Sequence, residues 1–531
     1  MTVRKASRVL VYGVLSISII QVVNRILSAV TTIFLTRSLG QSGYGLWSLI
    51  MSSIGILSLP AGILGTGTAI IKFVSQYDAE GKPNLVKKVT VLGLKVKIVT
   101  GLALGVSALF LAPFISENVL KLPELTLLIQ ITAIYFIVTQ INAAPEAVLK
   151  GLKQFHISAL LTALERILFL SIIALVLFSG LGLIGVVIGN VATYIILTTI
   201  TLIVVFAKYV PRPMHSSGGD NGTALLKMMI TYGTPAALGD LISSFYSDFI
   251  VIYLGMLTTT ASVGLFGAAR TALNFLFISP MLIVGRVLFP LASEMHSKKQ
   301  IEDLRRFLSL TSKYTLFFTC YMVTFTWFFA SEMVVLLYST EFEASAFYLQ
   351  IMMFIAIAGV WTSLAGNVLL GAGYSWLTLK LSVIYVISGT ALALLIVPAF
   401  GVVGTCLLLV FLQLFVVLPL NIIYTKRIVG NFLNPRAYAK GVPPLLICIV
   451  LMLWIKSIFA FQLSNFILSL ILLLCIFSLG LLLFSVVLCL TGAIRKSEIS
   501  SLNKILSTSR VANVLKPLTY LLRVLAKLAR A

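Results

Sequence analysis

Apolar stretches of roughly 20 residues, separated by short polar segments, recur along almost the whole chain. A stretch of this length crosses the ~30 Å hydrocarbon core of a membrane as one helix. Strands of a membrane barrel would instead be short and would alternate apolar with polar residues. The pattern therefore predicts an all-α integral membrane protein with about 14 transmembrane helices. The expected spans are roughly 9–35, 44–71, 89–113, 122–149, 158–178, 182–207, 227–256, 261–289, 313–338, 344–370, 376–397, 401–425, 442–460 and 464–491.

The two halves of the chain share short sequence matches that occur in the same order. The matches are "GLW" at 45–47 with "GLF" at 264–266, "VLKGLKQF" at 148–155 with "VLLGAGYS" at 368–375, and "GLIG" at 182–185 with "GVVG" at 401–404, with offsets of 219 (264 − 45), 220 (368 − 148) and 219 (401 − 182) residues. Nearly constant offsets indicate that spans 1–6 and 7–12 are two copies with the same orientation, related by a pseudo-twofold axis. Membrane chains built in this way are typically transporters, with the substrate path between the halves.

Lysine and arginine gather in alternate loops. They precede the first span and follow the second, fourth, sixth, eighth and twelfth spans, whereas the opposite loops carry few of them and collect glutamates such as Glu117 and Glu341. Because basic loops remain in the cytoplasm, we expect a multi-pass protein of the cell membrane with both termini cytoplasmic. The formal net charge of +23 then reflects topology, and no nucleic-acid partner is expected.

These patterns divide the chain into two pseudo-symmetric six-helix lobes with additions at the C-terminal end. We expect an N-terminal lobe at 1–210, a polar cytoplasmic linker at 211–226, a C-terminal lobe at 227–427, and spans 13 and 14 within 428–494. The tail at 495–531 alternates leucines with Lys and Arg at near-helical spacing. It is predicted to be a basic amphipathic helix that lies on the anionic inner leaflet, in preference to a helix for a protein partner.

The composition leaves little room for other chemistry. Hydrophobic residues make up 59% of the chain and charged residues 10%, and the mean hydropathy is +1.08. The five cysteines fall in predicted spans without paired spacing, and the three histidines lie far apart. We therefore expect no cofactor, no metal site and a protein that is not an enzyme. A monomer is also expected.

Arginine and asparagine occur inside two predicted spans. Arg25 lies mid-span in the first, beside Asn24, and Arg270 lies about two turns into the eighth, near Asn274. A charge in hydrocarbon costs about 3 kcal/mol or more, so each is a candidate functional residue. The guanidinium offers two parallel hydrogen bonds and keeps its charge, which suits a phosphate group. We expect these four residues to bind substrate; the alternative is that Arg25 pairs with an aspartate and holds the lobes together.

Acidic residues inside the spans are candidates for H⁺ or Na⁺ coupling or for that charge pair. Asp240 and Asp248 lie eight residues apart in the seventh span, close to one face of the helix. Glu146 lies near the cytoplasmic end of the fourth. Other cations near the cytoplasmic face are expected to reach the membrane surface as anchors, namely Lys95, Lys97, Arg166 and Arg286.

The segment "TRSLGQSGYGLWSL" at 36–49 resembles the R-x-L-G-x-x-x-Y-G signature of polysaccharide-biosynthesis membrane proteins. These are the Wzx-type oligosaccharide flippases of the multidrug/oligosaccharidyl-lipid/polysaccharide (MOP) exporter superfamily. The resemblance covers essentially the whole chain and includes "KFVSQY" at 72–77 and "VLKGLKQF" after the fourth span.

This resemblance implies a V-shaped, two-lobe transporter that moves a lipid-linked sugar by alternating access. It also implies a cationic cavity for a polyprenyl phosphate or pyrophosphate, to which Arg25 and Arg270 correspond by analogy. The motif residues are expected to shape the outer loop or gate; they are Arg37, Leu39, Gly40, Tyr44 and Gly45.

The predicted function is therefore the flipping of a polyprenyl-(pyro)phosphate-linked oligosaccharide from the cytoplasmic to the outer leaflet. The alternative is a multidrug and toxin exporter of the same superfamily, which would bind lipophilic cations at an acid on the first span. That span carries Arg25 and no acid, but Asp240 and Asp248 keep the alternative open. A third hypothesis is a non-transporting scaffold for glycan-assembly proteins, which are also the expected protein partners.

Overall fold

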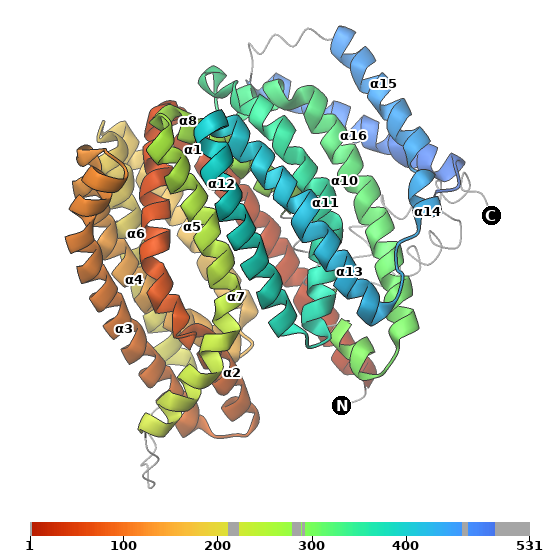
Figure 1. Cartoon of the computed structure of the whole chain (residues 1–531). Coiled ribbons are helices and arrows are strands. Elements are labelled where there is room, and N and C mark those ends of the chain that lie inside the picture. The colour runs from red at the N-terminus through yellow and green to blue at the C-terminus, as the bar shows by residue number, and fades with distance from the viewer. Residues whose placement is uncertain (1–2, 211–221, 279–287, 289–291, 459–465, 494–531) are drawn as a thin grey trace. The chain divides into compact units, whose positions relative to one another are not determined.

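The computed structural model describes residues 3–210, 222–278, 288, 292–458 and 466–493, with side chains from Val23 onward except at 235, 236 and 240 (Figure 1). Throughout these residues the regular elements are helices, without a strand. Eleven helical segments of this part are long and apolar enough to cross a membrane. The prediction of an all-α multi-pass membrane protein is confirmed. The predicted amphipathic tail at 495–531 and most of the predicted linker lie outside the described residues.

The eleven segments agree with the 14 predicted spans. Two of them hold two predicted spans each, because Val23–Ile63 is interrupted at Gly40 and Ser375–Val429 at Gly401. The predicted eighth span begins as α8 (Thr260–Leu273) and continues into residues outside the described part. The eleven segments therefore account for 13 of the 14 predicted spans, and only the start of the eighth is described.

The chain forms two compact units, Met1–Ala268 with Thr378–Leu408, and Ala269–Leu377 with Leu409–Ala531. The predicted lobe boundaries remain a prediction. The first unit contains α1 (Val3–Ile63), α2 (Thr66–Ala79), α3 (Pro83–Pro113), η1 (Phe114–Val119), η2 (Pro123–Leu125), α4 (Thr126–Gly151), α5 (Phe155–Phe178), α6 (Gly182–Val204), η3 (Val205–Tyr209), α7 (Gly222–Leu257), the start of α8 and most of α12 (Ser375–Phe411).

The second unit begins within α8. It contains η4 (Asn274–Ile278), α10 (Ile301–Leu337), η5 (Thr340–Phe342), α11 (Ser345–Gly371), both ends of α12, η6 (Leu412–Val417), α13 (Leu418–Val429), α14 (Pro435–Ala439), α15 (Val442–Ile458) and α16 (Phe466–Leu490). Aromatic side chains of α10 pack against α15 and α16. A Cβ on Gly480 of α16 would lie 2.6 Å from the Tyr321 hydroxyl of α10, so this glycine admits the ring. The last two spans are thus packed onto α10.

The internal repeat is visible in the backbone turns. Gly182 and Gly401, which one sequence match aligns, have φ of 52° and 53°. Lys153 and Gly373, aligned by another match, have φ of 59° and 90°. Positive φ is uncommon outside glycine, so its recurrence at aligned positions is specific. It recurs also in the pairs Gly81 with Lys299 and Lys121 with Ser339.

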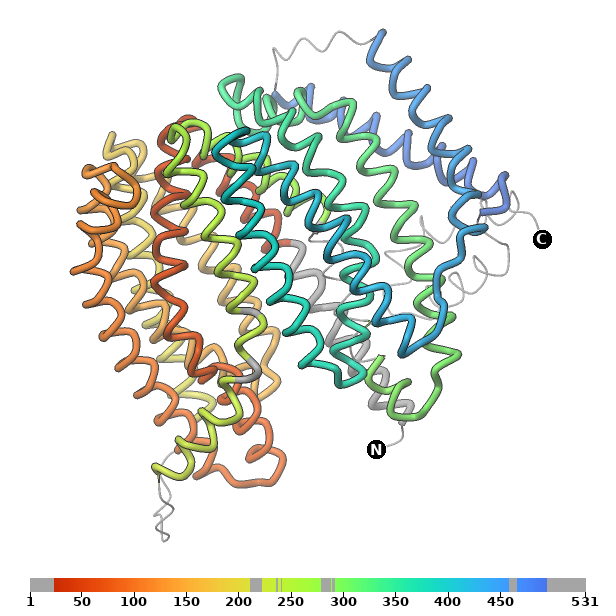
Figure 2. Tube along the Cα trace, in the orientation of Figure 1, coloured from red at the N-terminus to blue at the C-terminus, as the bar shows by residue number. Residues whose placement is uncertain are grey.

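The signature segment forms the turn within α1. Gly40 has φ 66° and ψ −175°, a conformation that glycine adopts without steric cost. Figure 2 shows the trace rising to this turn and descending after it. One of the five fixed residues of the signature, Gly40, therefore lies where the chain turns.

Two repeated glycines allow α1 and α8 to approach closely. A Cβ on Gly45 would lie 1.8 Å from the carbonyl oxygen of Thr260, and a Cβ on Gly264 would lie 2.0 Å from that of Gln41. Gln41 and Thr260 are separated by the same 219 residues (260 − 41) as the two glycines. The contact is therefore symmetric between the two sequence copies.

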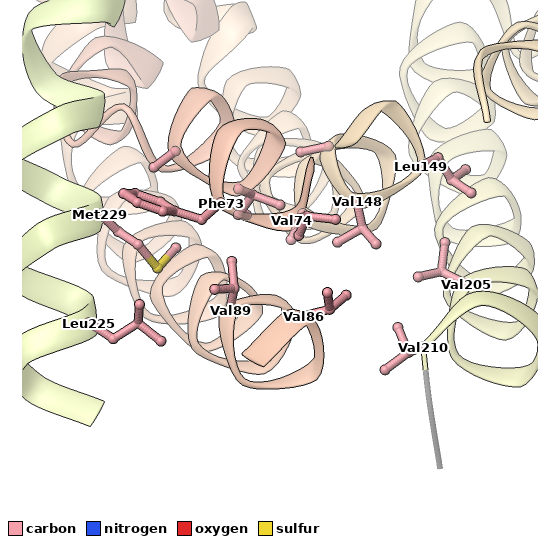
Figure 3. Close-up of a cluster of buried hydrophobic side chains, with 14 residues drawn as sticks. Phe73, Val74, Val86, Val89, Val148, Leu149, Val205, Val210, Leu225 and Met229 are labelled. Atoms are coloured by element: carbon pink, nitrogen blue, oxygen red, sulfur yellow. The ribbon is translucent and has the colours of Figure 1, made fainter. Parts of the chain in front are cut away.

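A cluster of buried apolar side chains joins several helix ends at one end of the first unit (Figure 3). Its labelled members are Phe73, Val74, Val86, Val89, Val148, Leu149, Val205, Val210, Leu225 and Met229. These residues lie in or next to the loops after α2, α4 and α6, which carry much of the basic charge of this unit. The loops that charge alternation predicted to share one side of the membrane therefore lie at one end of this unit.

Candidate functional site

The second half of α1 packs against α7 through glycines on both helices. A Cβ on Gly55 would lie 2.1 Å from a carboxylate oxygen of Asp248, and a Cβ on Gly255 would lie 2.4 Å from the Leu49 side chain. Asp248 is half-buried in this contact. The structure thus places one predicted acidic site residue against the backbone of α1, in a gap that only a glycine leaves open.

The first half of α1 carries the predicted pair Asn24 and Arg25. Asn24 is 6% exposed and its amide donates to the Ala159 carbonyl oxygen of α5 at 3.3 Å, whereas Arg25 is exposed. Arg25 lies fifteen residues before Gly40, and Gly55 lies fifteen residues after it. At a rise of 1.5 Å per residue both lie about 22 Å from the turn. Arg25 and the Asp248 carboxylate that contacts Gly55 are therefore at about the same distance from the turn at Gly40, within one unit.

A buried polar cluster lies among α4, α5 and α6. The Tyr194 hydroxyl donates to Glu165 Oε1 at 3.0 Å, and an Arg166 guanidinium nitrogen lies 3.6 Å from the same oxygen. The Tyr135 ring meets the Tyr194 ring edge-on, with centroids 4.9 Å apart. Glu165 is only 9% exposed, so its carboxylate is buried among the packed helices. There it contacts one phenol and one guanidinium. This arrangement can stabilise a negative charge or hold a proton.

Lys97 of α3 is buried, and its prediction as a surface anchor was wrong. It is 7% exposed, and its ammonium donates to Gln140 Oε1 of α4 at 2.8 Å. Gly101 and Gly105 continue the same face of α3, and a Cβ on Gly105 would lie 2.3 Å from Ile137 of α4. The spacing of four residues from Lys97 through these glycines was the signal that this face packs against a neighbour.

The acidic candidates other than Asp248 have different surroundings. Glu146 is half-buried and pairs with Lys150 Nζ at 2.6 Å, one turn along α4. Asp240 lies in α7, but its side chain is outside the described residues, as is Arg286.

The remaining candidates lie in the second unit. Arg270 is half-buried near the end of α8, and Asn274 is exposed at the start of η4. Arg25 belongs to the first unit, so each arginine is described only in its own surroundings. Their shared role as a substrate-binding pair stays a prediction.

The signature residues occupy the turn of α1 and its packing onto α8. Tyr44 is 7% exposed, and its ring lies 3.2 Å from where a Cβ on Gly267 would be. Gly45 makes the backbone contact described above, and Gly40 makes the turn, whereas Arg37 is exposed. These positions shape the local backbone; their predicted role in a gate remains a prediction.

Comparison with known proteins agrees with this architecture. The family model described as "Polysaccharide biosynthesis protein" matches residues 10–296, more than half of the chain. An uncharacterized membrane protein of Methanocaldococcus jannaschii, MJ1068, is 22% identical over 367 residues, which are 65% of this chain and 70% of that protein.

Solved structures of the MOP superfamily share the fold. The lipid II flippase MurJ, in an inward closed conformation, aligns with a TM-score of 0.70 at 14% identity over 88% of this chain and 98% of MurJ. An inward-facing multidrug resistance MATE transporter gives 0.63 at 16% identity over 77% and 95%. A MOP transporter from Pyrococcus furiosus, described as having a binding pocket of reverse polarity, gives 0.60 at 14% over 79% and 96%. The chain therefore belongs to the polysaccharide biosynthesis protein family and has the fold of MOP superfamily transporters.

Proposed function

We propose that this protein flips an oligosaccharide linked to a polyprenyl phosphate or pyrophosphate from the cytoplasmic to the outer leaflet. The observation that carries the proposal is the chemistry of α1 in a member of this family. The whole of α1 contains neither Asp nor Glu, and its transmembrane part presents Arg25 beside the buried Asn24. An arginine repels lipophilic cations and suits a phosphate.

Lipid flipping by a protein of this fold has a structural relative in the lipid II flippase MurJ. The description of the Pyrococcus protein associates reversed pocket polarity with a different function within the superfamily. The Pyrococcus description supports the use of pocket charge to choose between functions within this superfamily.

Ion coupling is part of the proposal. Two carboxylates lie between packed helices of the first unit. Asp248 lies against Gly55, and Glu165 accepts a hydrogen bond from Tyr194. A carboxylate in such a place can take up H⁺ or Na⁺ when the surrounding helices move. We propose that one of these groups links the ion gradient to transport.

Reconstitution tests the proposed function. Purified protein in liposomes should move a fluorescent polyprenyl-phosphate sugar between leaflets, and Arg25→Ala should slow this movement by about tenfold or more. Lys95→Ala is the matched control, because Lys95 is an exposed cation on the neighbouring α3. Equal loss in both variants, or normal movement in Arg25→Ala, would refute the role given to Arg25.

The cation exporter is the second candidate, favoured by the half-buried Asp248 on α7. It predicts that expression protects cells from cationic dyes and that Asp248→Asn removes the protection. Dye resistance of this kind, without movement of the lipid-linked sugar, would replace the flippase proposal.

A further inference from the structure

A cavity of about 680 Å³ lies between α2 and the first turns of α7, within the first unit. Its walls carry Lys72, Gln76 and Tyr77 from α2 and Lys227, Met228 and Tyr232 from α7. Three of these residues belong to "KFVSQY", in which Phe73 and Val74 are buried in the apolar cluster while Lys72 and Gln76 are exposed. The cavity therefore brings a segment of the first sequence copy together with the start of the second copy.

Both lysines of the cavity are exposed, and no carboxylate of the described residues pairs with either of them. The nearby Glu80 is occupied, because Lys82 Nζ lies 2.7 Å from its carboxylate and Gln76 donates to it at 2.8 Å. Among the residues that the structure describes, the two positive charges of the cavity thus have no carboxylate partner. An anion bound there would neutralise both.

Lys72 is held in position by aromatic rings. Its ammonium lies 3.6 Å from the centroid of the Tyr232 ring and 5.0 Å from that of Phe73. A ring face attracts the ammonium without accepting all of its hydrogen bonds, so donors remain for an anion. The N-terminus of α7 begins at Gly222, just before the cavity, and adds a partial positive charge.

The walls also contain apolar groups that water would not favour. Met228 is 41% exposed, Tyr232 is 39% exposed and the neighbouring Ile71 is 36% exposed. Lysine and tyrosine next to exposed apolar side chains are typical of residues at the depth of the lipid head groups. A ligand that satisfies the whole site therefore has a negatively charged head and an apolar tail.

We propose that this cavity binds the phosphate head group of an anionic lipid at the membrane surface on the side of the basic loops. The phosphate lies between Lys72 and Lys227, and the acyl or prenyl chain follows Met228 into the bilayer. Such a lipid contacts both α2 and α7 and so stabilises the packing of α7, the first helix of the second sequence copy. The site is separate from Arg25 and does not depend on the identity of the cargo.

Lipid binding to the purified full-length protein tests this site. The probes are a short-chain phosphatidylglycerol, a polyprenyl phosphate, zwitterionic phosphatidylcholine and inorganic phosphate, measured by native mass spectrometry in a neutral detergent. Lys72→Gln and Lys227→Gln should each weaken binding of the two anionic lipids about fivefold, the scale of one basic residue at an anionic surface. Lys72→Arg should keep the binding.

Lys208→Gln is the matched control. Lys208 is also exposed at this end of the unit and lies over an aromatic ring, 5.6 Å from the Tyr209 centroid, but it is outside the cavity. The control should bind both anionic lipids like the unmodified protein. A photoreactive group on the lipid tail should label the peptide that contains Met228.

Three results would overturn the proposal. Equal weakening by Lys208→Gln would show general attraction to a basic surface, and unchanged binding in both cavity variants would exclude the cavity. Binding of inorganic phosphate as tight as that of the lipids would make this a soluble-anion site. Preference for the polyprenyl phosphate over phosphatidylglycerol supports the site and shows that it favours a prenyl chain over an acyl chain. If the unmodified protein binds the anionic lipids in the cavity but does not move the lipid-linked sugar, only the proposed function is refuted.

Discussion

Arg25 is the residue on which the flippase and the drug-exporter hypotheses differ most directly. Arg25→Ala should reduce glycan export in cells by about tenfold or more, on the scale of one lost charge-assisted hydrogen bond, while the protein still folds and inserts. Arg25→Lys should restore export only in part, because an ammonium cannot make two parallel hydrogen bonds to one phosphate. Export is measured by the glycan that reaches the cell surface.

The charge-pair alternative makes a different prediction for the same residue. If Arg25 serves to neutralise Asp248, Arg25→Ala should lower the amount of folded protein, and Asp248→Asn should restore it. Fluorescence-detected size-exclusion chromatography measures folded protein independently of export. Recovery of this kind would assign Arg25 a structural role.

Glu165 and Tyr194 allow a stability test at the residue scale. Tyr194→Phe removes the donor to a buried carboxylate oxygen that lies 3.0 Å away, and should lower the free energy of unfolding by about 1.5–3 kcal/mol. Tyr253→Phe on α7 is a control, because Tyr253 stacks on Phe249 and the substitution keeps the ring. A thermal-unfolding midpoint that falls equally in both variants would contradict the hydrogen bond.

The contact between α1 and α8 depends on Gly45 and Gly264, where the two helices approach closely. Gly45→Ala or Gly264→Ala places a methyl group within about 2 Å of a backbone oxygen. Backbone cannot move aside as a side chain can, so both variants should lose folded protein or shift its melting temperature strongly downward. The same substitution at Gly67, where no atom lies within 4 Å of the added Cβ, should be neutral or slightly stabilising.

A comparison of these melting temperatures decides whether the crossing is correct. Equal stability of Gly45→Ala and Gly67→Ala would mean that α1 and α8 are not in contact at this point. The sequence match suggested that these glycines were equivalent. It did not indicate that they pack against each other's helices.

The whole molecule has a topology that cysteine labelling can test. Single cysteines at Asp78 and His156 lie at the end of the first unit that carries the basic loops, and should react only from the cytoplasm. Cysteines at Lys121 and Ser179 lie at the connections after α3 and α5 and should react only from outside. The background lacks the five native cysteines. Reaction of Asp78→Cys from outside would invert the assignment.

The match between sequence and structure is close for the membrane spans and weaker for the site. Thirteen of the 14 predicted spans agree with the helices, the repeat agrees with the turns at Gly182 and Gly401, and the family resemblance agrees with the comparisons. The predicted site residues are untested, and one prediction, Lys97 as an anchor, was wrong. The cavity between α2 and α7 was not predicted, because Lys72 and Lys227 are separated by more than 150 residues.

Hydrophobic length, turn glycines and loop charge are local properties, and the sequence by itself determined what depends on them. A helix spans the membrane because its own backbone groups are satisfied within it, whatever its neighbours are. The face that each helix turns toward another is decided only when the helices pack. Only the packing of the helices therefore decided three contacts. Lys97 donates to Gln140, Glu165 accepts from Tyr194, and the Lys72 ammonium lies over the Tyr232 ring of α7.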